Sequence, residues 1–294
     1  MKKLKIVYVA VFDTTGVSTN TSQAIALQKL GHQVFCYNYR IKSRLLGDDE
    51  LRDKDIVQAC KKIKPDLILF AKCNEVDIDV FKCCKNIAPL GYWFADPLIT
   101  YNDDQFLIKT QIADFFCGDK RNVINKALSY NSNSYLIAEG YDSLLEKPKD
   151  TPQDLDISFI GNLYGDRATN MKHIKRSVDI INNAYGSKHS EIVSRTKINL
   201  NFCTSHGASD RVYKIMGAKG FLLTDDWEGR ADMFEDGVHL VIYNDFDDLN
   251  EKIEYYLKKG AERDKIREQG YKEVQQYTRY EWAKKVTEFV KQKI

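Results

Sequence analysis

The stretch "SDRVYKIMGAKGFLLTDD" (residues 209–226) contains two different periodicities in immediate succession. Val212, Ile215 and Met216 are spaced three and four apart, which predicts one apolar face of a helix over 210–219. The apolar run 221–224 then follows a glycine and ends at two acidic residues, which is typical of a short buried strand. The stretch therefore predicts a helix that packs on a sheet and leads directly into one of its strands.

The same stretch sets Arg211 and Lys214 on the other face of the predicted helix, in its first turn. Cations at this end oppose the helix dipole and cost roughly 0.3–1 kcal/mol each. Their position becomes favourable when a phosphate binds, because backbone N–H groups and a guanidinium fork both suit its oxygens. The alternative is that Asp210, Asp225 or Asp226 neutralises them, and this stretch alone leaves both possibilities open.

Similar alternation extends in both directions along the chain. Near-continuous apolar strands that alternate with helices predict parallel sheets covered on both faces. We therefore expect two Rossmann-like, doubly wound units in series. The expected strands are 5–12, 33–39, 65–73, 90–95, 113–118 and 134–140 in the first unit, and 157–162, 178–182, 198–202 and 221–224 in the second.

The charged segment 144–156, with Pro148 and Pro152, is the best linker candidate between the units. The predicted division is a first domain over 1–147, a linker over 148–155, a second domain over 156–275 and a final helix over 276–294. Ligands of such folds bind at the carboxyl ends of the strands, which is where we look for the site.

Composition excludes several classes of protein. The chain has 294 residues and a formal net charge of +2, so no global basic field drives it onto nucleic acid. Its seven cysteines are odd in number and lie mostly in apolar runs, which favours reduced thiols in a cytoplasmic protein. No stretch approaches the roughly 20 apolar residues that span a bilayer.

Residues 194–257 resemble the C-terminal domain of GT-B glycosyltransferases, most closely the branch of the CgeB-like spore-maturation proteins. The resemblance covers about 155–280 and is only architectural before about 130. The segment 157–167 is similar to the opening strand and Gly-Asn loop of that domain. The matching positions are Lys197, Ile198, Leu200, Asn201, Arg211, Tyr213, Ile215, Gly220, Thr224, Asp225, Phe234, Gly237, Tyr243, Asp245 and Leu249.

The resemblance implies an α/β GT-B fold, in which two Rossmann-like domains face a cleft and the last helix crosses back to the first domain. From the sequence alone, a last helix that covers its own domain is equally plausible. It also implies transfer of a sugar from a nucleotide-diphosphate sugar to a hydroxyl acceptor, with no metal and no cofactor. The leaving diphosphate would be bound by Arg211, assisted by Lys214, and by the loop of Gly161 and Asn162.

Lys214 stands where relatives carry a Glu that holds the ribose or the sugar of the donor. Either Asp225, Asp226 or Glu228 takes over this role, the donor is held differently, or activity is lost. His206 lies in a turn-rich loop near the predicted phosphate site.

The acceptor and a general base would come from the first domain. Asp96, after the strand 90–95, and Asp13, after the first strand, are rival candidates for the base, and either acid can equally cap the next helix. The acceptor is a small molecule, a polymer, a protein or a hydroxylated DNA base, the last supported by the basic clusters 61–64 and 172–176. The alternative function is a non-catalytic binding or structural protein with the GT-B fold.

Overall fold

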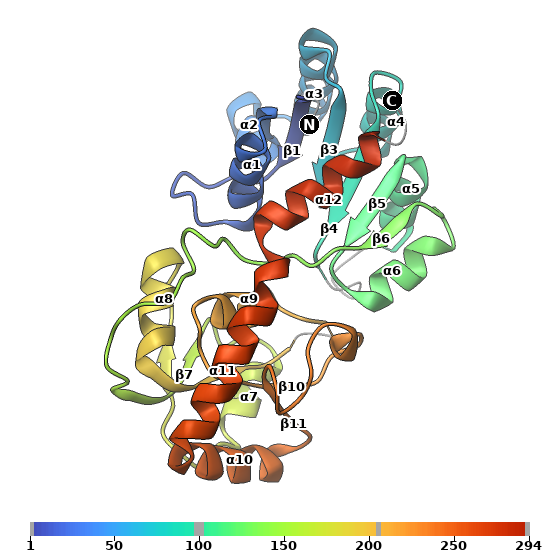
Figure 1. Ribbon diagram of the computed structural model, residues 1–294. Coiled ribbons are helices and arrows are strands. Elements are labelled where there is room, and N and C mark those ends of the chain that lie inside the picture. The colour runs from blue at the N-terminus through green and yellow to red at the C-terminus, as the bar shows by residue number, and fades with distance from the viewer. Residues whose placement is uncertain (1–2, 97–102, 204–206, 292–294) are drawn as a thin grey trace. The chain divides into compact units, whose positions relative to one another are not determined.

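The computed structural model describes residues 3–96, 103–203 and 207–291, which form two compact units (Figure 1). The first unit comprises residues up to 139 together with the segment from 279 onward, and the second comprises 140–278. All seven cysteines are free thiols, as the composition predicted. Across the described ranges, no helix is both long and apolar enough to cross a membrane.

The first unit is built on a parallel sheet of six strands in the order β2-β1-β3-β4-β5-β6. Alternate residues of β1 and β3 enter separate apolar clusters, which shows that both faces of the sheet are covered. The elements are β1 (Lys5–Ala10), α1 (Thr19–Lys29), β2 (Gln33–Asn38), α2 (Tyr39–Leu46), α3 (Asp49–Ile63), β3 (Leu67–Ala71), α4 (Ile78–Lys85), β4 (Leu90–Phe94), α5 (Asp103–Ile112), β5 (Phe115–Gly118), α6 (Arg121–Leu128) and β6 (Ser134–Leu136).

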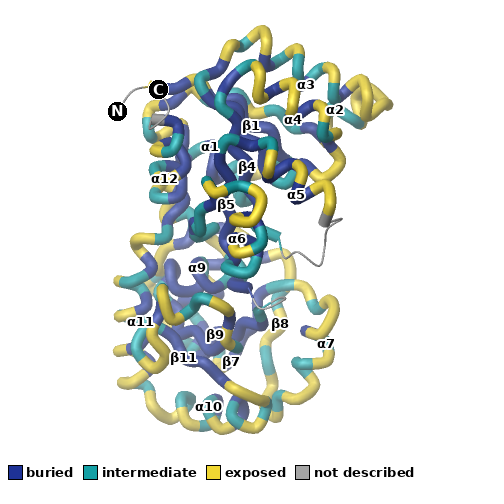
Figure 2. Tube along the Cα trace, turned by 90° about the vertical axis from the view of Figure 1, so that its right-hand side faces the viewer, coloured by how far each residue is buried: buried dark blue, intermediate teal, exposed yellow. Residues whose placement is uncertain are grey.

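The second unit repeats this plan with five parallel strands in the order β11-β10-β9-β7-β8. The central strands of both sheets are among the most buried segments of the chain (Figure 2). The predicted pair of doubly wound units is therefore confirmed. The elements are β7 (Leu155–Ile160), α7 (Asp166–Met171), β8 (Asp179–Ile181), α8 (Gly186–Arg195), β9 (Thr196–Asn201), α9 (Asp210–Gly217), β10 (Leu222–Asp225), β11 (Val241–Tyr243), α10 (Phe246–Lys258) and α11 (Gly260–Val274).

The last helix, α12 (Arg279–Lys291), belongs to the first unit and packs against α1. Its Trp282 is 1% exposed and meets the Trp93 ring edge-on, with 5.4 Å between ring centroids. Tyr8 of β1 stacks on the same indole. The helix therefore returns to the first unit, as the resemblance implied, because its aromatic residues complete the core on that face of the sheet.

The chain passes from one unit to the other between Glu139 and Gly140 and returns between Thr278 and Arg279. Tyr141 and Thr278, next to these two points, form a β-bridge within the second unit. The segment 148–155, expected to be a linker, lies inside the second unit. The backbone N–H of Lys149 in this segment donates to Ser194 Oγ on α8 at 3.0 Å.

We expect Trp282→Ala to lower the stability of the first unit by about 3–5 kcal/mol, because it empties a fully buried aromatic site. Native-state hydrogen exchange reports this loss as reduced protection of β1 and β4 amides, with β7 and β9 unchanged. Tyr280→Ala, at an exposed position of the same helix, serves as the control and should change protection little. Equal losses in both units would contradict the assignment of this helix to the first unit.

Candidate functional site

The candidate site is a cavity of about 130 Å³ at the carboxyl ends of β7 and β8 and the start of α9. β7 and β9 are neighbours in the sheet, and their following strands lie on opposite sides, so this is the switch point where ligands of doubly wound folds bind. The cavity is smaller than whole-ligand pockets, which suits one compact polar group. It is lined by Ile160, Gly161, Asn162, Asn183, Ala184, Tyr185, His189, Asp210, Arg211 and Lys214.

Among the described residues, the side-chain contacts of Arg211 on α9 are with neutral groups. Its Nε donates to the Ile160 carbonyl at 2.7 Å, and its Nη1 donates to Asn201 Oδ1 at 2.7 Å. Its Cζ lies 4.7 Å from the centroid of the Phe159 ring. Arg211 forms no ion pair with any described residue, so Asp210, Asp225 and Asp226 do not neutralise this guanidinium.

This positive charge is further disfavoured by its surroundings. Burial and then the nearby charge of Arg167 lower the pKa of Arg211 to about 10, which leaves it protonated at neutral pH. Arg167 of α7 is 7% exposed and lies over the Tyr164 ring at 4.5 Å. An anion next to Arg211 in the cavity would offset this cost.

Sequence analysis missed Arg167. It lies in the stretch 157–167 that carries part of the resemblance, but nothing in its spacing sets it apart from a surface residue. Only the turn after β7 brings its charge near Arg211.

Lys214 differs from Arg211 because it has an acidic partner one turn earlier on the same helix. Its Nζ lies 2.6 Å from Asp210 Oδ2. For this cation, the predicted neutralisation by Asp210 is confirmed. Ser209 precedes α9 but turns its hydroxyl to Asn201 Oδ1 at 3.0 Å, so its side chain does not cap the helix. The start of α9, whose Asp210 and Arg211 line the cavity, carries the positive end of the helix dipole.

Gly161 has a φ of +147°, in the half of backbone space that favours glycine. Its N–H donates to the Ile181 carbonyl at 3.0 Å, so the sheet uses the amide that was expected to cradle a phosphate. A Cβ at this position would lie 2.8 Å from Arg211 Nη2, so the absence of a side chain makes room for the guanidinium. Asn162 next to it lines the cavity, is exposed and has no hydrogen-bond partner among the described residues.

We expect Gly161→Ala to destabilise the second unit by about 2–4 kcal/mol, because it adds backbone strain and displaces Arg211 from its partners. Gly165→Ala is the matched control, since Gly165 has a φ of +56° but an added Cβ would meet nothing within 4 Å. That control should cost about 1–2 kcal/mol. Hydrogen exchange of β7 and β9 measures both losses. Equal losses would mean that Gly161 makes no room for Arg211.

The other predicted donor-site residues do not line this cavity. Asp225 accepts hydrogen bonds from the backbone N–H of Cys203 at 2.7 Å and from the Thr224 hydroxyl at 3.2 Å, and burial raises the pKa of Asp225. Asp226 pairs with Arg230 at 2.8 Å. His206 lies outside the described residues. Asp225 and Asp226 thus serve neighbouring loops in this structure.

In the first unit, Asp96 follows β4 and pairs with Lys72, which follows β3, at 2.6 Å. Lys72 and Cys73 have φ values of +60° and +51°, so the chain leaves β3 in the left-handed region twice in succession. The Tyr92 hydroxyl donates to the Lys72 carbonyl, and Lys109 Nζ donates to the Cys73 carbonyl. Strained backbone of this kind is frequent at functional sites, and here it directs Lys72 toward Asp96.

Asp13, the rival acid, organises the loop before α1. Its carboxylate accepts hydrogen bonds from the backbone N–H groups of Thr15, Val17 and Ser18 and from the hydroxyls of Thr15, Ser18 and Thr21. Burial acts to raise the pKa of Asp13, but the hydrogen bonds from Ser18, Thr15 and Thr21 outweigh it and hold the pKa well below the ordinary value. Such a carboxylate is a weak base.

We expect Asp13→Asn to destabilise the first unit by about 1–3 kcal/mol near neutral pH. Because the folded-state pKa of Asp13 is depressed, its contribution is present above the ordinary carboxyl pKa and is lost as the pH falls through the folded value. Urea unfolding at about pH 7 and about pH 3 should therefore show the difference shrinking in acid. Asp79→Asn, at an exposed ion pair, is the control. A pH-independent difference would contradict this account.

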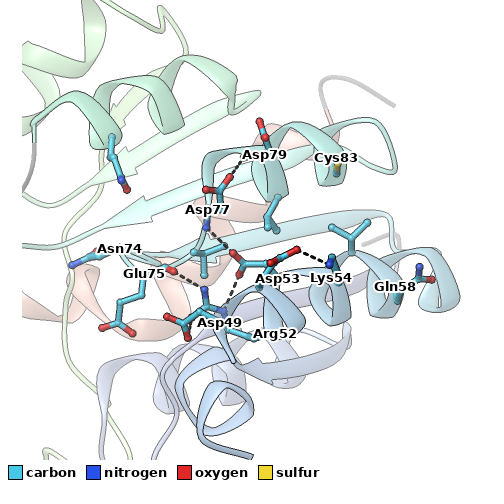
Figure 3. Close-up of a pocket in the computed structure, with 15 residues that line it drawn as sticks. Asp49, Arg52, Asp53, Lys54, Gln58, Asn74, Glu75, Asp77, Asp79 and Cys83 are labelled. Carbon is cyan, nitrogen blue, oxygen red and sulfur yellow. Dashed lines mark hydrogen bonds and ion pairs between the residues drawn. The ribbon is translucent and has the colours of Figure 1, made fainter. Parts of the chain in front are cut away.

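A larger cavity of about 790 Å³ lies between α3 and α4 of the first unit (Figure 3). Its acidic side chains have local partners. Arg52 donates to Asp49 Oδ1 and Asp53 Oδ1, and Asp77 accepts from the backbone at the start of α4. Helix capping and local ion pairs explain why these acidic side chains lie here.

Comparison with known proteins identifies the class. The family model described as glycosyl transferase-like matches residues 142–291, just over half of the chain, so the chain belongs to this family. No curated protein matches the sequence.

Solved structures match over nearly the whole chain. Anabaena HepE in complex with UDP-glucose has a TM-score of 0.74 at 11% identity, covering 98% of this chain and 100% of HepE. Sucrose-phosphate synthase of Thermosynechococcus elongatus has a TM-score of 0.72 at 12% identity, covering 99% of both chains. The lipopolysaccharide outer core galactosyltransferase WaaB, in its apo form, has a TM-score of 0.62 at 12% identity, covering 99% of this chain and 100% of WaaB. At these identities the matches show the fold, which is GT-B.

Proposed function

We propose that this protein transfers a sugar from a nucleotide-diphosphate sugar to a hydroxyl acceptor, without a metal ion. The observation that carries the proposal is the guanidinium of Arg211, which lines a cavity at the switch point and whose hydrogen-bond and ring partners among the described residues are all neutral. Membership of the glycosyl transferase-like family supports it. The HepE structures, which contain UDP-glucose or UDP, support a uridine nucleotide as the first donor to test.

In the proposed reaction, the bond between the sugar C1 and the diphosphate oxygen breaks, and the acceptor oxygen forms the new bond to C1. Negative charge develops on the departing diphosphate. Arg211, the neighbouring Arg167 and the first turn of α9 stabilise that charge from positions fixed before the reaction. Asn162 adds a polar contact in the same cavity.

The acceptor hydroxyl loses its proton as it attacks, and we propose Asp96 as the base that takes it. Lys72 Nζ lies 2.6 Å from Asp96 Oδ1, and no described residue pairs with Asp96 Oδ2, the oxygen proposed to take the substrate proton. Asp13 is the weaker candidate, because the hydrogen bonds of its own loop use its carboxylate.

The acceptor is proposed to be a polymer or a protein, with a hydroxylated DNA base as a less supported choice. In the basic cluster 172–176, Lys175 and Arg176 lie beside Asp247 and Glu254, which reduces their availability to phosphates. Assignment to the CgeB-like branch rests on the sequence resemblance.

The alternative is a non-catalytic protein that binds through the same fold. The observation that favours it is Lys214, which stands in the cavity where relatives carry a Glu and is paired with Asp210. Incubation with a panel of nucleotide sugars and mass spectrometry separates the two functions. Release of free sugar or its transfer supports the enzyme, and binding without turnover supports the alternative.

We expect Arg211→Ala to lower kcat/KM for the best nucleotide sugar by roughly 30-fold to 1000-fold. This factor corresponds to the ~2–4 kcal/mol lost when a preorganised hydrogen-bond donor that stabilises developing charge is removed. Steady-state kinetics with that donor measures the effect. Arg176→Ala is the matched control, because it removes an exposed cation of the same unit that is paired with Glu254. Turnover by the Arg211 variant at the level of this control would contradict the assignment.

A further inference from the structure

His189 is a buried polar side chain in the wall of the candidate donor cavity. It lies on α8, is 4% exposed and lines the cavity together with Asp210, Arg211 and Lys214. Neither its Nδ1 nor its Nε2 has a hydrogen-bond partner within the described part of the chain. Buried polar atoms are almost always paired, so a side chain with both ring nitrogens unpaired reduces stability and calls for a ligand to pair with them.

The imidazole of His189 is neutral at physiological pH. Burial and then the charge of Lys214 lower the pKa of His189 to about 3, with Arg211 acting in the same direction and Asp210 against it. A neutral imidazole offers one N–H donor and one nitrogen acceptor. The two ring nitrogens point in different directions, so they need two partner groups, one that accepts a hydrogen bond and one that donates a hydrogen bond.

The hydroxyl groups of a nucleotide sugar can both accept and donate hydrogen bonds, whereas its ionised phosphate oxygens can only accept them. An ionised diphosphate only accepts, and it would leave the second imidazole nitrogen unpaired. The Asp210 carboxylate lines the same cavity and is fixed by Lys214. A carboxylate accepts hydrogen bonds from hydroxyls but repels phosphate, so this part of the cavity suits neighbouring hydroxyls rather than a second anion.

We propose that His189 and Asp210 bind hydroxyl groups of the donor next to the diphosphate held by Arg211, and that His189 makes the site selective for ligands with those hydroxyls. This inference rests on the proposed function. The hydroxyls belong either to the ribose or to the transferred sugar, and both present the same chemistry. His189 thus acts as a specificity-determining residue of the donor site.

The test compares the ligand affinities of the wild type and of His189→Phe. This substitution keeps a planar ring of similar size and removes both polar nitrogens. The reference nucleotide is whichever of UDP, GDP and ADP binds the wild type most tightly by isothermal titration calorimetry. Its 2′-deoxy and 3′-deoxy forms test the ribose. Its glucose, galactose and N-acetylglucosamine conjugates test the transferred sugar.

We expect the wild type to lose at least about tenfold in affinity when the relevant hydroxyl is removed, inverted or replaced. His189→Phe should bind both members of that pair with similar affinity. If the affinity ratio of a deoxynucleotide pair differs between the wild type and the variant, the hydroxyl belongs to the ribose. If the ratio of a conjugate pair differs, the hydroxyl belongs to the transferred sugar. If every pair shows the same ratio in both proteins, the inference is wrong. If none of the nucleotides and conjugates binds the wild type, the proposed function itself fails.

The stability of the ligand-free protein gives an independent readout. Because the variant removes two unpaired buried nitrogens, we expect His189→Phe to raise the midpoint of thermal unfolding by about 2–8 °C while weakening nucleotide binding. A merely structural histidine would give a lower midpoint.

Where the variant does not fold, the wild type still tests the inference. In ¹⁵N-histidine NMR spectra, the nucleotide should shift the ring resonances of His189, whereas inorganic diphosphate should leave them nearly unchanged. Equal shifts with both compounds would overturn the role of a hydroxyl.

Discussion

The architecture of the second unit depends on placing one cationic side chain, Arg211, against neutral partners. A desolvated guanidinium without a carboxylate is disfavoured. This cost is offset because the guanidinium donates hydrogen bonds to the Ile160 carbonyl and to Asn201 Oδ1 and lies over the Phe159 ring. Gly161 supplies the space for it. Arg167 adds a second positive charge close by. The result is a small cavity at the switch point of the sheet, lined by the Arg211 guanidinium and by the ion pair of Lys214 and Asp210.

The two sheets are wound in corresponding orders but place different chemistry at their carboxyl edges. In the second unit the edge carries buried cations and a neutral histidine, which suit a diphosphate flanked by hydroxyls. In the first unit it carries the pair of Lys72 and Asp96 beside strained backbone, which suits proton transfer. The proposed reaction assigns donor binding to the second unit and acceptor activation to the first.

Strand and helix alternation predicted both doubly wound units, because strands buried on two faces are apolar almost throughout and are easily recognised. The position of Arg211 at the start of a helix was also predictable from the apolar spacing of the residues that follow it, and its role in phosphate binding stays a prediction. The sequence did not predict which side chains pair with Arg211 and Lys214. Asp210 was one of three acids available to the cations, and only the helix geometry assigns it to Lys214. His189 could not be singled out, because the sequence around it resembles that of an ordinary surface helix and only packing buries it.

The central claim is that the unpaired charge of Arg211 is the binding site for a donor diphosphate. A crystal structure of the protein with the nucleoside diphosphate that binds it most tightly tests this claim most directly. The account predicts diphosphate oxygens within hydrogen-bonding distance of the guanidinium, with the ribose on the side of His189. A diphosphate bound elsewhere on the protein, with Arg211 still held only by Ile160 and Asn201, would contradict it.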